Sequence, residues 1–389
     1  MSAYLPAGKL VTKARLDDAL PLLSAAAVAD HVHVNLGVNP ETMTMAPALT
    51  ATPGRAYGGG LVLSSYGPRY AGSDVMSAYG YAHADGWNLS GSVTHGLPGS
   101  TPKQSSGGGY LGESMRLSRP TPDGVFALAV SHAHYRTGGI LRPLDLTGTI
   151  TQAQAGWKYP VLAGHVWVRG GLAYASNSEN LGVLAWTTTQ KNFSAYAGLA
   201  GHDVWHHTLI NVRATVWHGL AGSDTTSAGS PNLMGTWSAG YAVERIRVSA
   251  HRQFGPVMLH GVFGAQHGSR GTPQVMQSYI GGEHRGSSFF TGSFSGPSGY
   301  WWSASASAAK PITADIRGVK FAVIPYAGLN GGEVMPVFGP NVRVSSVAAG
   351  VKFNLGGHFS GLAGYSHTIS APSGVRQSSL FNFELVSRF

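Results

Sequence analysis

The sequence predicts an all-β fold, a sixteen-stranded antiparallel transmembrane β-barrel preceded by a short N-terminal α/β segment. Three observations predict it. Charged residues make up only 11 % of the 389 residues, against about 25 % in an ordinary soluble domain. Glycine accounts for 55 residues and cysteine for none, which excludes disulfides and zinc–thiolate sites. Alternating apolar and polar segments of roughly 10 to 14 residues recur along the chain, and no apolar run is long enough for a membrane helix.

Residues 1–54 differ in pattern from the rest of the chain. Apolar side chains recur at helical spacing within residues 13–27, which predicts a helix. Residues 31–38 alternate as a strand does, and the Pro53-Gly54 pair marks a boundary. A segment of this length buries little core by itself, so we interpret it as a fragment of an α/β domain.

From residue 55 to residue 389 the alternation is uniform and predicts the barrel strands in order. Lys158 lies on the polar face of its segment, opposite a face rich in alanine and aromatic residues. The same alternation puts Arg245, Arg247 and Lys352 on polar faces, so all four are predicted to face the lumen. Aromatic residues gather near segment ends, as the interface girdles of a membrane barrel require. The predicted strands are 57–66, 71–83, 87–97, 108–119, 124–135, 148–159, 163–174, 190–201, 205–218, 236–252, 257–267, 299–310, 319–330, 343–355, 359–369 and 379–389.

The connections between these strands alternate in length. Most connections after even-numbered strands are tight turns, such as 84–86 and 356–358, and most after odd-numbered strands are longer. The longest is 268–298. Short periplasmic turns and long extracellular loops are typical of outer-membrane barrels, which predicts that both chain ends face the periplasm. Closure of the barrel pairs every backbone amide and carbonyl group and leaves no sheet edge in the lipid.

Charge and motif content exclude several classes of function. The net charge is +9 with neutral histidine, but the basic residues are scattered, so no nucleic-acid-binding arm is predicted. The chain contains no phosphate-binding Gly-Lys-Ser/Thr loop, no His-Glu-x-x-His zinc motif and no nucleophile elbow. We therefore predict a protein that is not an enzyme and needs no cofactor.

Histidine is abundant, with 17 residues. His202, His206 and His207 lie at a predicted tight turn with one carboxylate nearby, and His132 and His134 share a strand face. We interpret them as histidines of the membrane interface and the lumen, and we predict no metal site. A lumen charge that changes with pH stays open, because histidine titrates near about pH 6.5.

Four segments resemble the outer-membrane translocators of two-partner secretion, the haemolysin-activator type or TpsB-like family. The first is residues 64–72. There Gly67, Arg69 and Gly72 fit the family's Asn-x-Gly-x-Arg-x-x-Gly signature, and Ser65 stands at the position of the Asn.

The second segment, 279–301, resembles the family's Gly-Gly-x-x-Val-Arg-Gly-Phe motif followed by Ser-Gly-x-x-Gly. Gly281, Gly282, Arg285 and Gly286 match, with one residue fewer before the Arg. The positions of the family's Val and aromatic residue carry other residues here. The resemblance implies that these four residues anchor or gate the loop.

The third segment, 324–334, resembles the pattern Pro-Tyr-x-Phe-x-Asp-x-Gly-x-Val. Gly332 matches, and Asn330 stands where the family has Asp. In the family the long loop folds into the lumen, where its Arg pairs with that Asp. The resemblance therefore implies that Arg285 hydrogen-bonds Asn330 without a charged partner, a weaker pairing unless an acid such as Glu283 compensates.

The fourth segment is the terminal FNFELVSRF, whose last residue, Phe389, resembles the aromatic signal read by the barrel-assembly machinery. Residues 1–54 resemble the tail of a second polypeptide-transport-associated (POTRA) domain, so we expect a signal peptide and further POTRA sequence upstream of a truncated chain. Over 55–389 the resemblance implies a pore that moves a partner exoprotein of haemolysin or adhesin type from periplasm to cell surface without nucleotide. The implied partners are the unfolded exoprotein with its N-terminal secretion domain, the assembly machinery and outer-membrane lipids.

Three alternatives stay open from the sequence. A passive diffusion porin would conduct permanently and would not need the 279–301 motif. A barrel-assembly or lipid-handling relative of the same superfamily would need several POTRA domains. A soluble β-sandwich also has alternating strands. The identity of the exoprotein, the open or plugged state of the lumen and the oligomeric state are left open as well.

Overall fold

The computed structural model describes residues 29–39, 44–53, 55–97, 107–162, 165–229, 237–316, 318–375 and 379–389, together with Ala19, Leu22 and Asn232. Three short 3-10 helices lie among these residues: η1 (Gly139–Leu144), η2 (Gly182–Leu184) and η3 (Gln274–Met276). None of the helices in the described part of the chain is long and apolar enough to cross a membrane.

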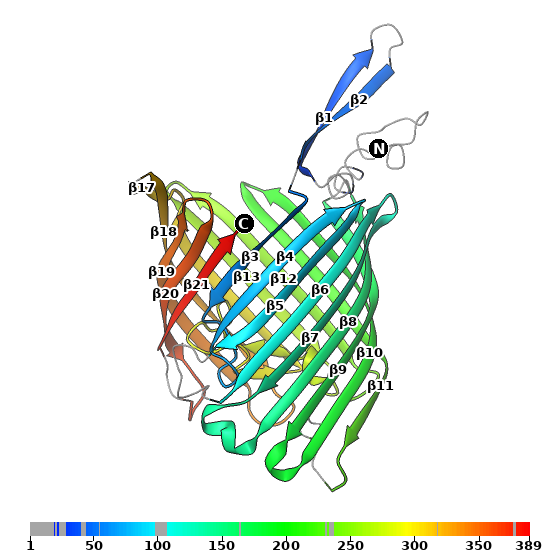
Figure 1. Cartoon of the computed structure of the whole chain (residues 1–389), viewed down its shortest axis with the longest axis vertical. Helices are drawn as coiled ribbons and strands as arrows, with labels where there is room; N and C mark the ends of the chain where they lie inside the picture. The colour runs from blue at the N-terminus through cyan, green and yellow to red at the C-terminus, as the bar shows by residue number, and fades with distance from the viewer. Residues whose placement is uncertain are drawn as a thin grey trace.

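Most of the described residues form a closed antiparallel barrel in which each wall strand pairs with the next one in chain order (Figure 1). Two segments, β16 and β17, pair one after the other with β18 and share one of the sixteen strand positions. The sheet closes where β21 pairs with β3, from Glu384 opposite Ser64 to Arg388 opposite Gly60. The predicted sixteen-stranded antiparallel barrel is confirmed. The strands are β3 (Tyr57–Ser64), β4 (Asp74–Ala84), β5 (Trp87–Leu97), β6 (Gly109–Thr121), β7 (Gly124–Arg136), β8 (Leu146–Val161), β9 (Val166–Leu181), β10 (Trp186–Trp205), β11 (Thr208–Thr226), β12 (Ala242–Phe254), β13 (Val257–Gly268), β16 (Ser298–Ala308), β17 (Ile312–Ile316), β18 (Val319–Met335), β19 (Val342–Leu355), β20 (Phe359–Ser370) and β21 (Ser379–Arg388).

Tight turns gather at one end of the barrel, where β3 begins and β21 ends (Figure 1). Between β10 and β11 the turn consists of His206 and His207, with φ of 47° and 62°. Two successive residues with positive φ match the twist of a two-residue hairpin. The structural role of these two histidines is therefore to make a turn.

Strands β9, β10 and β11 extend further than the sequence predicts. The prediction for β10 covers residues 190–201, whereas the strand runs over 20 residues. Near η2 the sequence is rich in serine, threonine and asparagine on both faces of these strands. Apolar and polar residues alternate only where one face meets lipid, so the extensions carry no such signal. Strand β17 is also absent from the predicted set.

The segment before the barrel contains a two-stranded antiparallel sheet, β1 (Ala29–Asn39) with β2 (Thr44–Pro53). The strand predicted at 31–38 lies within β1. The helix predicted at 13–27 falls outside the described residues, apart from Ala19 and Leu22, which are helical.

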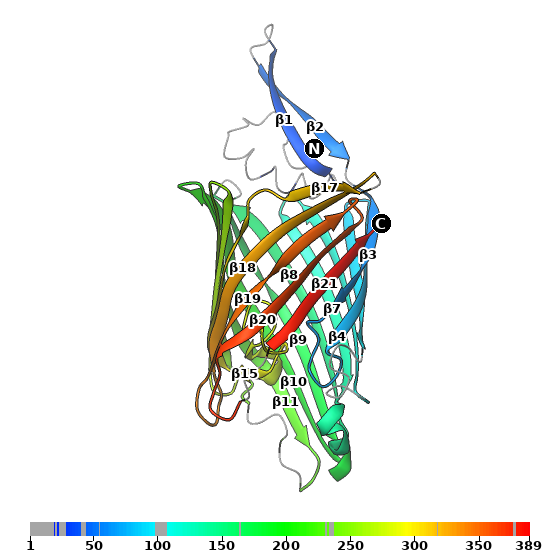
Figure 2. The ribbon, with the colours of Figure 1, turned by 90° about the vertical axis from the view of Figure 1, so that its left-hand side faces the viewer.

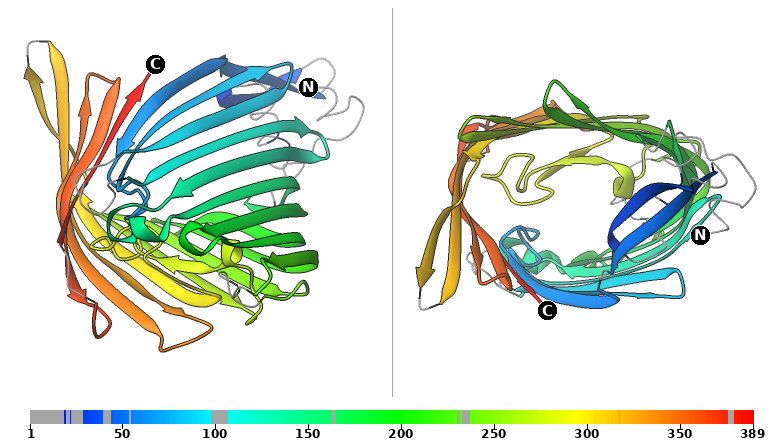
Figure 3. Two further views of the ribbon diagram at one scale, coloured as in Figure 1. Left: turned by 60° about the horizontal axis from the view of Figure 1, so that its bottom comes forward. Right: turned by 90° about the horizontal axis from the view of Figure 1, so that it is seen from above.

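The longest connection, 268–298, is called the lumen loop below, because it lies inside the ring of strands when the barrel is seen from above (Figure 3). It contains η3 and a small hairpin in which β14 (Ser278–Ile280) pairs with β15 (Phe294–Gly296). Figure 2 shows β15 within the outline of the barrel, away from the end that carries the tight turns.

The two faces of the barrel wall differ in chemistry. Asn330 and Ser346, which contact the lumen loop, are buried. The preceding residue on β18, Leu329, and the following residue on β19, Val347, are 45 % and 39 % exposed on the outside. An apolar exterior around a polar interior is the pattern of a barrel in lipid, and the closed sheet overturns the β-sandwich alternative.

Candidate functional site

The shape of the lumen loop depends on its glycines. Gly281, Gly282 and Gly286 have φ of 109°, 93° and 113°, a region that side chains other than glycine rarely adopt. A Cβ on Gly281 would also clash with the carbonyl oxygen of Phe290. The backbone amide of Gly281 donates to the carbonyl of Arg285 at 2.9 Å, so the motif forms a compact turn.

Asn330, on β18, holds this turn through backbone groups. Its Oδ1 accepts hydrogen bonds from the amides of Gly286 at 3.0 Å and Ser287 at 2.7 Å. Its Nδ2 donates to the hydroxyl of Ser287 at 3.0 Å. A Cβ on Gly332, two residues further along β18, would clash with the carbonyl oxygen of Tyr300 on the next strand. The close approach of β16 and β18 beside Asn330 therefore requires glycine there.

The structure does not contain the expected hydrogen bond between Arg285 and Asn330. The guanidinium carbon of Arg285 lies 4.2 Å from the ring centre of Tyr279 and 4.6 Å from that of Trp301. Its Nη1 donates to the carbonyl of Tyr279 at 3.3 Å. Glu283 does not compensate, because its carboxylate contacts His284 at 3.6 Å. Aromatic faces thus take the place of a carboxylate beside this cation.

A hydroxyl network joins the loop to the last strands. The hydroxyl of Ser288 lies 2.7 Å from that of Ser346 on β19 and 2.8 Å from that of Thr368 on β20. Ser346 and Thr368 are register partners, so the contact spans two neighbouring strands. The carbonyl of Ser287 accepts from the hydroxyl of Ser366 at 2.7 Å. The sequence prediction missed all of these partners.

An apolar cluster lies beside this network. Ile280 and Phe289 of the loop pack against Val334 and Val344 of the wall, and all four are at most 7 % exposed. Full burial of such side chains contributes roughly 1.5–3 kcal/mol each. The lumen loop is therefore packed against β18 and β19 as a small core, as well as hydrogen-bonded to them.

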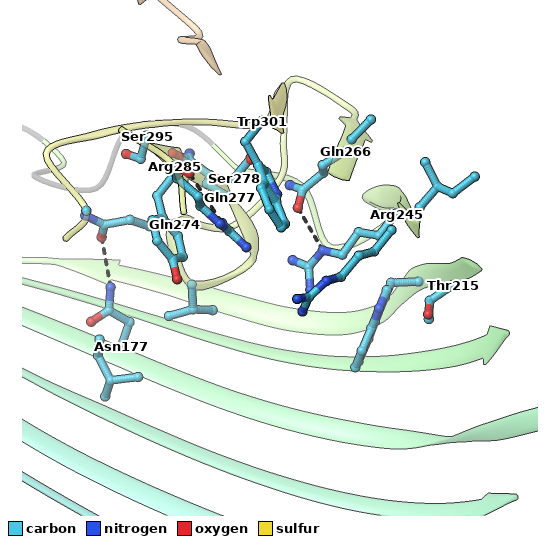
Figure 4. A pocket seen from close by; sticks show the side chains of 18 of the residues that line it. Asn177, Thr215, Arg245, Gln266, Gln274, Gln277, Ser278, Arg285, Ser295 and Trp301 are labelled. Carbon is cyan, nitrogen blue, oxygen red and sulfur yellow. Dashed lines mark hydrogen bonds between the residues drawn. The ribbon is translucent and has the colours of Figure 1, made fainter. Parts of the chain in front are cut away.

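The opposite part of the loop is held by β12 and β13. Gln266 donates from Nε2 to the carbonyls of Met276 at 2.8 Å and Pro297 at 2.9 Å. Arg245 donates from Nε to Gln266 Oε1 and from Nη2 to the carbonyl of Met276, both at 2.7 Å. Figure 4 shows Gln266 and Arg245 beside Trp301. One glutamine thus joins the beginning and the end of the loop.

Residues 64–72, the first of the four family-like segments, and the residues beside them also contact the lumen loop. Thr291 donates from its hydroxyl to the carbonyl of Tyr66 at 2.8 Å. The guanidinium carbon of Arg69 lies 5.9 Å from the ring centre of Phe290. Gly67 donates its amide to the carbonyl of Ser73 at 2.9 Å, which folds this connection back on itself. Segments more than 200 residues apart in sequence are thereby brought together.

The end of the chain closes the barrel beside this segment. Phe383 donates its amide to the hydroxyl of Ser65 at 2.9 Å, and Ser65 donates its amide back to the carbonyl of Phe383 at 3.0 Å. Phe389 exchanges backbone hydrogen bonds with Gly59 at 3.1 and 3.3 Å. Its ring is 70 % exposed. Asn382 links this last strand to the loop by donating to the carbonyl of Ser287 at 3.2 Å.

A cavity of about 660 Å³ lies between the loop and the β9–β13 wall (Figure 4). Two of the predicted lumen residues, Arg245 and Arg247, line it together with Arg285. The other two lie elsewhere on the inner face. Lys158 Nζ is 4.5 Å from the ring centre of Trp167, and Lys352 Nζ is 5.8 Å from that of Tyr326. In the described part of the chain, no group of three or more metal-ligating side chains forms a metal site.

No protein-family model matches the sequence, and no curated protein matches it. The structure is similar to that of CdiB from Escherichia coli, with a TM-score of 0.79 and 14 % identity over 100 % of this chain and 73 % of that chain. It is also similar to CdiB from Acinetobacter baumannii, with a TM-score of 0.74 and 13 % identity over 100 % of this chain and 70 % of that chain. The chain thus has the barrel fold of the CdiB structures.

Proposed function

We propose that this chain is an outer-membrane pore that translocates a partner exoprotein from the periplasm to the cell surface without nucleotide. One observation carries the proposal: the four segments that resemble two-partner secretion translocators meet at the lumen loop. Asn330 bonds Gly286 and Ser287, Tyr66 accepts from Thr291, and Asn382 bonds Ser287. The similarity to the CdiB barrels supports the same proposal.

In this proposal the end that carries the tight turns faces the periplasm, together with residues 1–54 as a partial POTRA-like segment. The 55–389 barrel is the pore, and its terminal Phe389 is read by the barrel-assembly machinery. The exoprotein enters unfolded and folds outside. Folding at the surface supplies direction, because a folded domain cannot return through the lumen.

The contacts of the lumen loop suit a reversible gate. Its tip is held mainly by neutral hydroxyl and amide hydrogen bonds, such as those of Ser288 and Asn330. Each such bond contributes about 0.5–1.5 kcal/mol net, since water replaces it when it breaks. A passing chain can therefore displace the loop step by step without separating a buried ion pair.

A cysteine pair tests this gate directly, because the chain has no native cysteine. Ser288→Cys with Ser346→Cys would cross-link the loop to β19, at side chains 2.7 Å apart. Ser345→Cys with Ser370→Cys is the matched control, since these hydroxyls are also 2.7 Å apart but join two wall strands. The test uses an exoprotein sought among the reading frames that flank the gene, expressed with a signal peptide and scored by protease accessibility on intact cells.

We expect surface exposure of the exoprotein only when the barrel is present. Oxidation should block exposure in the loop-locked pair, a reductant should restore it, and the control pair should secrete in both states. An exoprotein that stays in the periplasm beside a folded barrel, which instead gives a permanent and stable conductance, would contradict the proposal and identify a diffusion porin.

A further inference from the structure

The cavity beside the lumen loop has a strong excess of positive charge. Its lining includes five arginines from three wall strands and the loop, against one carboxylate, Glu179. That carboxylate accepts a hydrogen bond from Tyr135 at 2.9 Å. In the described part of the chain the close ion pairs are Arg136–Asp145 and Glu283–His284, so no cavity arginine has a carboxylate partner. The five are Arg169, Arg213, Arg245, Arg247 and Arg285.

Two of these arginines are placed directly opposite each other. Arg213 on β11 and Arg247 on β12 are register partners, and like charges directly opposite destabilise a sheet. Among the described residues, the guanidinium of Arg213 has no hydrogen bond. That of Arg247 contacts the ring of Trp301, at 5.5 Å from its centre. The Nε of Arg169 is buried and also lacks a hydrogen-bond partner.

The spacing of these charges indicates the shape of an anion that could pair with all of them. Neighbouring strands are about 4.8 Å apart, so the span from β9 to β12 is roughly 15 Å. A single phosphate or carboxylate reaches one or two guanidinium groups. An extended polypeptide carries same-face side chains about 6.6 Å apart, so several acidic side chains in a row would reach the whole set.

We infer that this cavity binds an acidic stretch of an unfolded polypeptide through carboxylate–guanidinium pairs. The inference rests on the proposed function, because the translocating chain supplies the polypeptide, and it names acidic segments as the class of sequence that the lumen retains. Arg285 belongs to the lumen loop and the other four arginines to the wall. A bound acidic segment therefore contacts both the loop and the wall.

The test measures binding of fluorescently labelled hexaglutamate to the full chain in detergent, by fluorescence anisotropy at low and high salt. The test variant is Arg213→Gln with Arg247→Gln. The control is Arg119→Gln with Arg252→Gln, which removes the same charge from arginines that lie over Trp87 and Phe254, outside the cavity lining. A mobility shift on heating confirms that each variant is folded.

We expect the cavity variant to bind hexaglutamate at least about tenfold more weakly, because charge-assisted pairs are the strong ones, and the control to bind as the unaltered chain does. Labelled hexalysine should not bind, and salt should weaken binding of hexaglutamate. Equal losses in both variants, or displacement by tripolyphosphate at lower concentration than by hexaglutamate, would overturn the inference. A barrel that secretes the exoprotein but binds no hexaglutamate overturns this inference alone, whereas binding without secretion overturns the proposed function.

Discussion

The side-chain oxygen of Asn330 lies 3.0 Å from the backbone nitrogen of Gly286, 44 residues earlier in the chain. Both residues are buried. One neutral side chain of the wall thus fixes the turn at which the lumen loop reverses. Because an amide oxygen has two lone pairs, the same atom also accepts the amide of Ser287.

Removal of this acceptor should free the loop. In Asn330→Ala two buried amides, those of Gly286 and Ser287, lose their partner, and each unsatisfied group costs about 1–3 kcal/mol. We expect a lower heat-unfolding midpoint on a semi-native gel and faster proteolysis within 268–298. Asn354→Ala, at an exposed position of β19, is the control. Equal protease resistance of both variants would show that Asn330 does not hold the loop.

Asn330→Asp introduces the residue that the family pattern has at this position, and it should strengthen the attachment of the loop that Asn330→Ala weakens. In Asn330→Asp both amides keep an acceptor, and a hydrogen bond to a carboxylate is stronger than one to a neutral amide. The hydroxyl of Ser287, which now accepts from Asn330 at 3.0 Å, can donate instead. We expect slower proteolysis of the loop than in the unaltered chain. Faster proteolysis in Asn330→Asp would show that burial of the charge outweighs the stronger hydrogen bonds.

A side chain at Gly286 should strain the turn. Its φ is 113°, and a Cβ would lie 2.9 Å from Val344 Cγ2. Gly286→Ala should therefore lower the stability of the loop by about 1–2 kcal/mol or more. Gly292→Ala has a φ of 71°, at the edge of the left-handed region that side chains can adopt, and meets nothing within 4 Å, so the difference between the two variants measures the contact with Val344 together with the greater backbone strain at Gly286. Matching unfolding midpoints would mean that neither the contact nor the strain costs stability.

The barrel could be predicted from the sequence because each strand separates lipid from lumen. Because of that contrast, apolar and polar residues alternate along the lipid-facing part of each wall strand, as in β13 and β19. The alternation is lost at the ends of β10 and β11 near η2, where both strand faces are polar. Strand β17 follows β16 along the same edge of β18. The prediction assigns that place in the wall to the single strand 299–310.

The loop motif was predicted in part. Gly281, Gly282 and Gly286 were identified because a family pattern requires glycine there, and their positive φ values give the reason. Ser288 and Ser346 were missed, because a small polar residue on an inner strand face has the same pattern whether it meets water or a loop. The predicted hydrogen-bond partner of Arg285 was wrong, because the aromatic residues that surround its guanidinium are set by the fold of the loop.

Gln266 should act as a clamp on the two ends of the loop. It donates to the carbonyls of Met276 and Pro297 and accepts from Arg245. Gln266→Leu keeps the approximate volume but leaves three polar groups, two buried carbonyls and the partly buried guanidinium of Arg245, without this partner. We expect a lower unfolding midpoint and a shifted conductance. Gln253→Leu, which removes a hydrogen bond at an exposed turn, should change neither, and an unaltered midpoint in Gln266→Leu would contradict the clamp.

Phe389 should matter for assembly more than for the stability of the finished barrel. Its ring is exposed on the outside, and its backbone groups, not its side chain, pair with Gly59. In Phe389→Ala the backbone pairing stays, so the purified barrel should keep its unfolding midpoint within about 0.5 kcal/mol, as expected for a surface substitution. The amount of folded barrel in the outer membrane should nevertheless fall, because the terminal aromatic residue would no longer be read.

Phe359→Ala, which removes another exposed aromatic side chain at the same end of the barrel, controls for the loss of apolar surface. If both variants reach the membrane in equal amount, the terminal position has no special role, and if Phe389→Ala also unfolds at lower temperature, the ring is a structural part of the seam between β21 and β3.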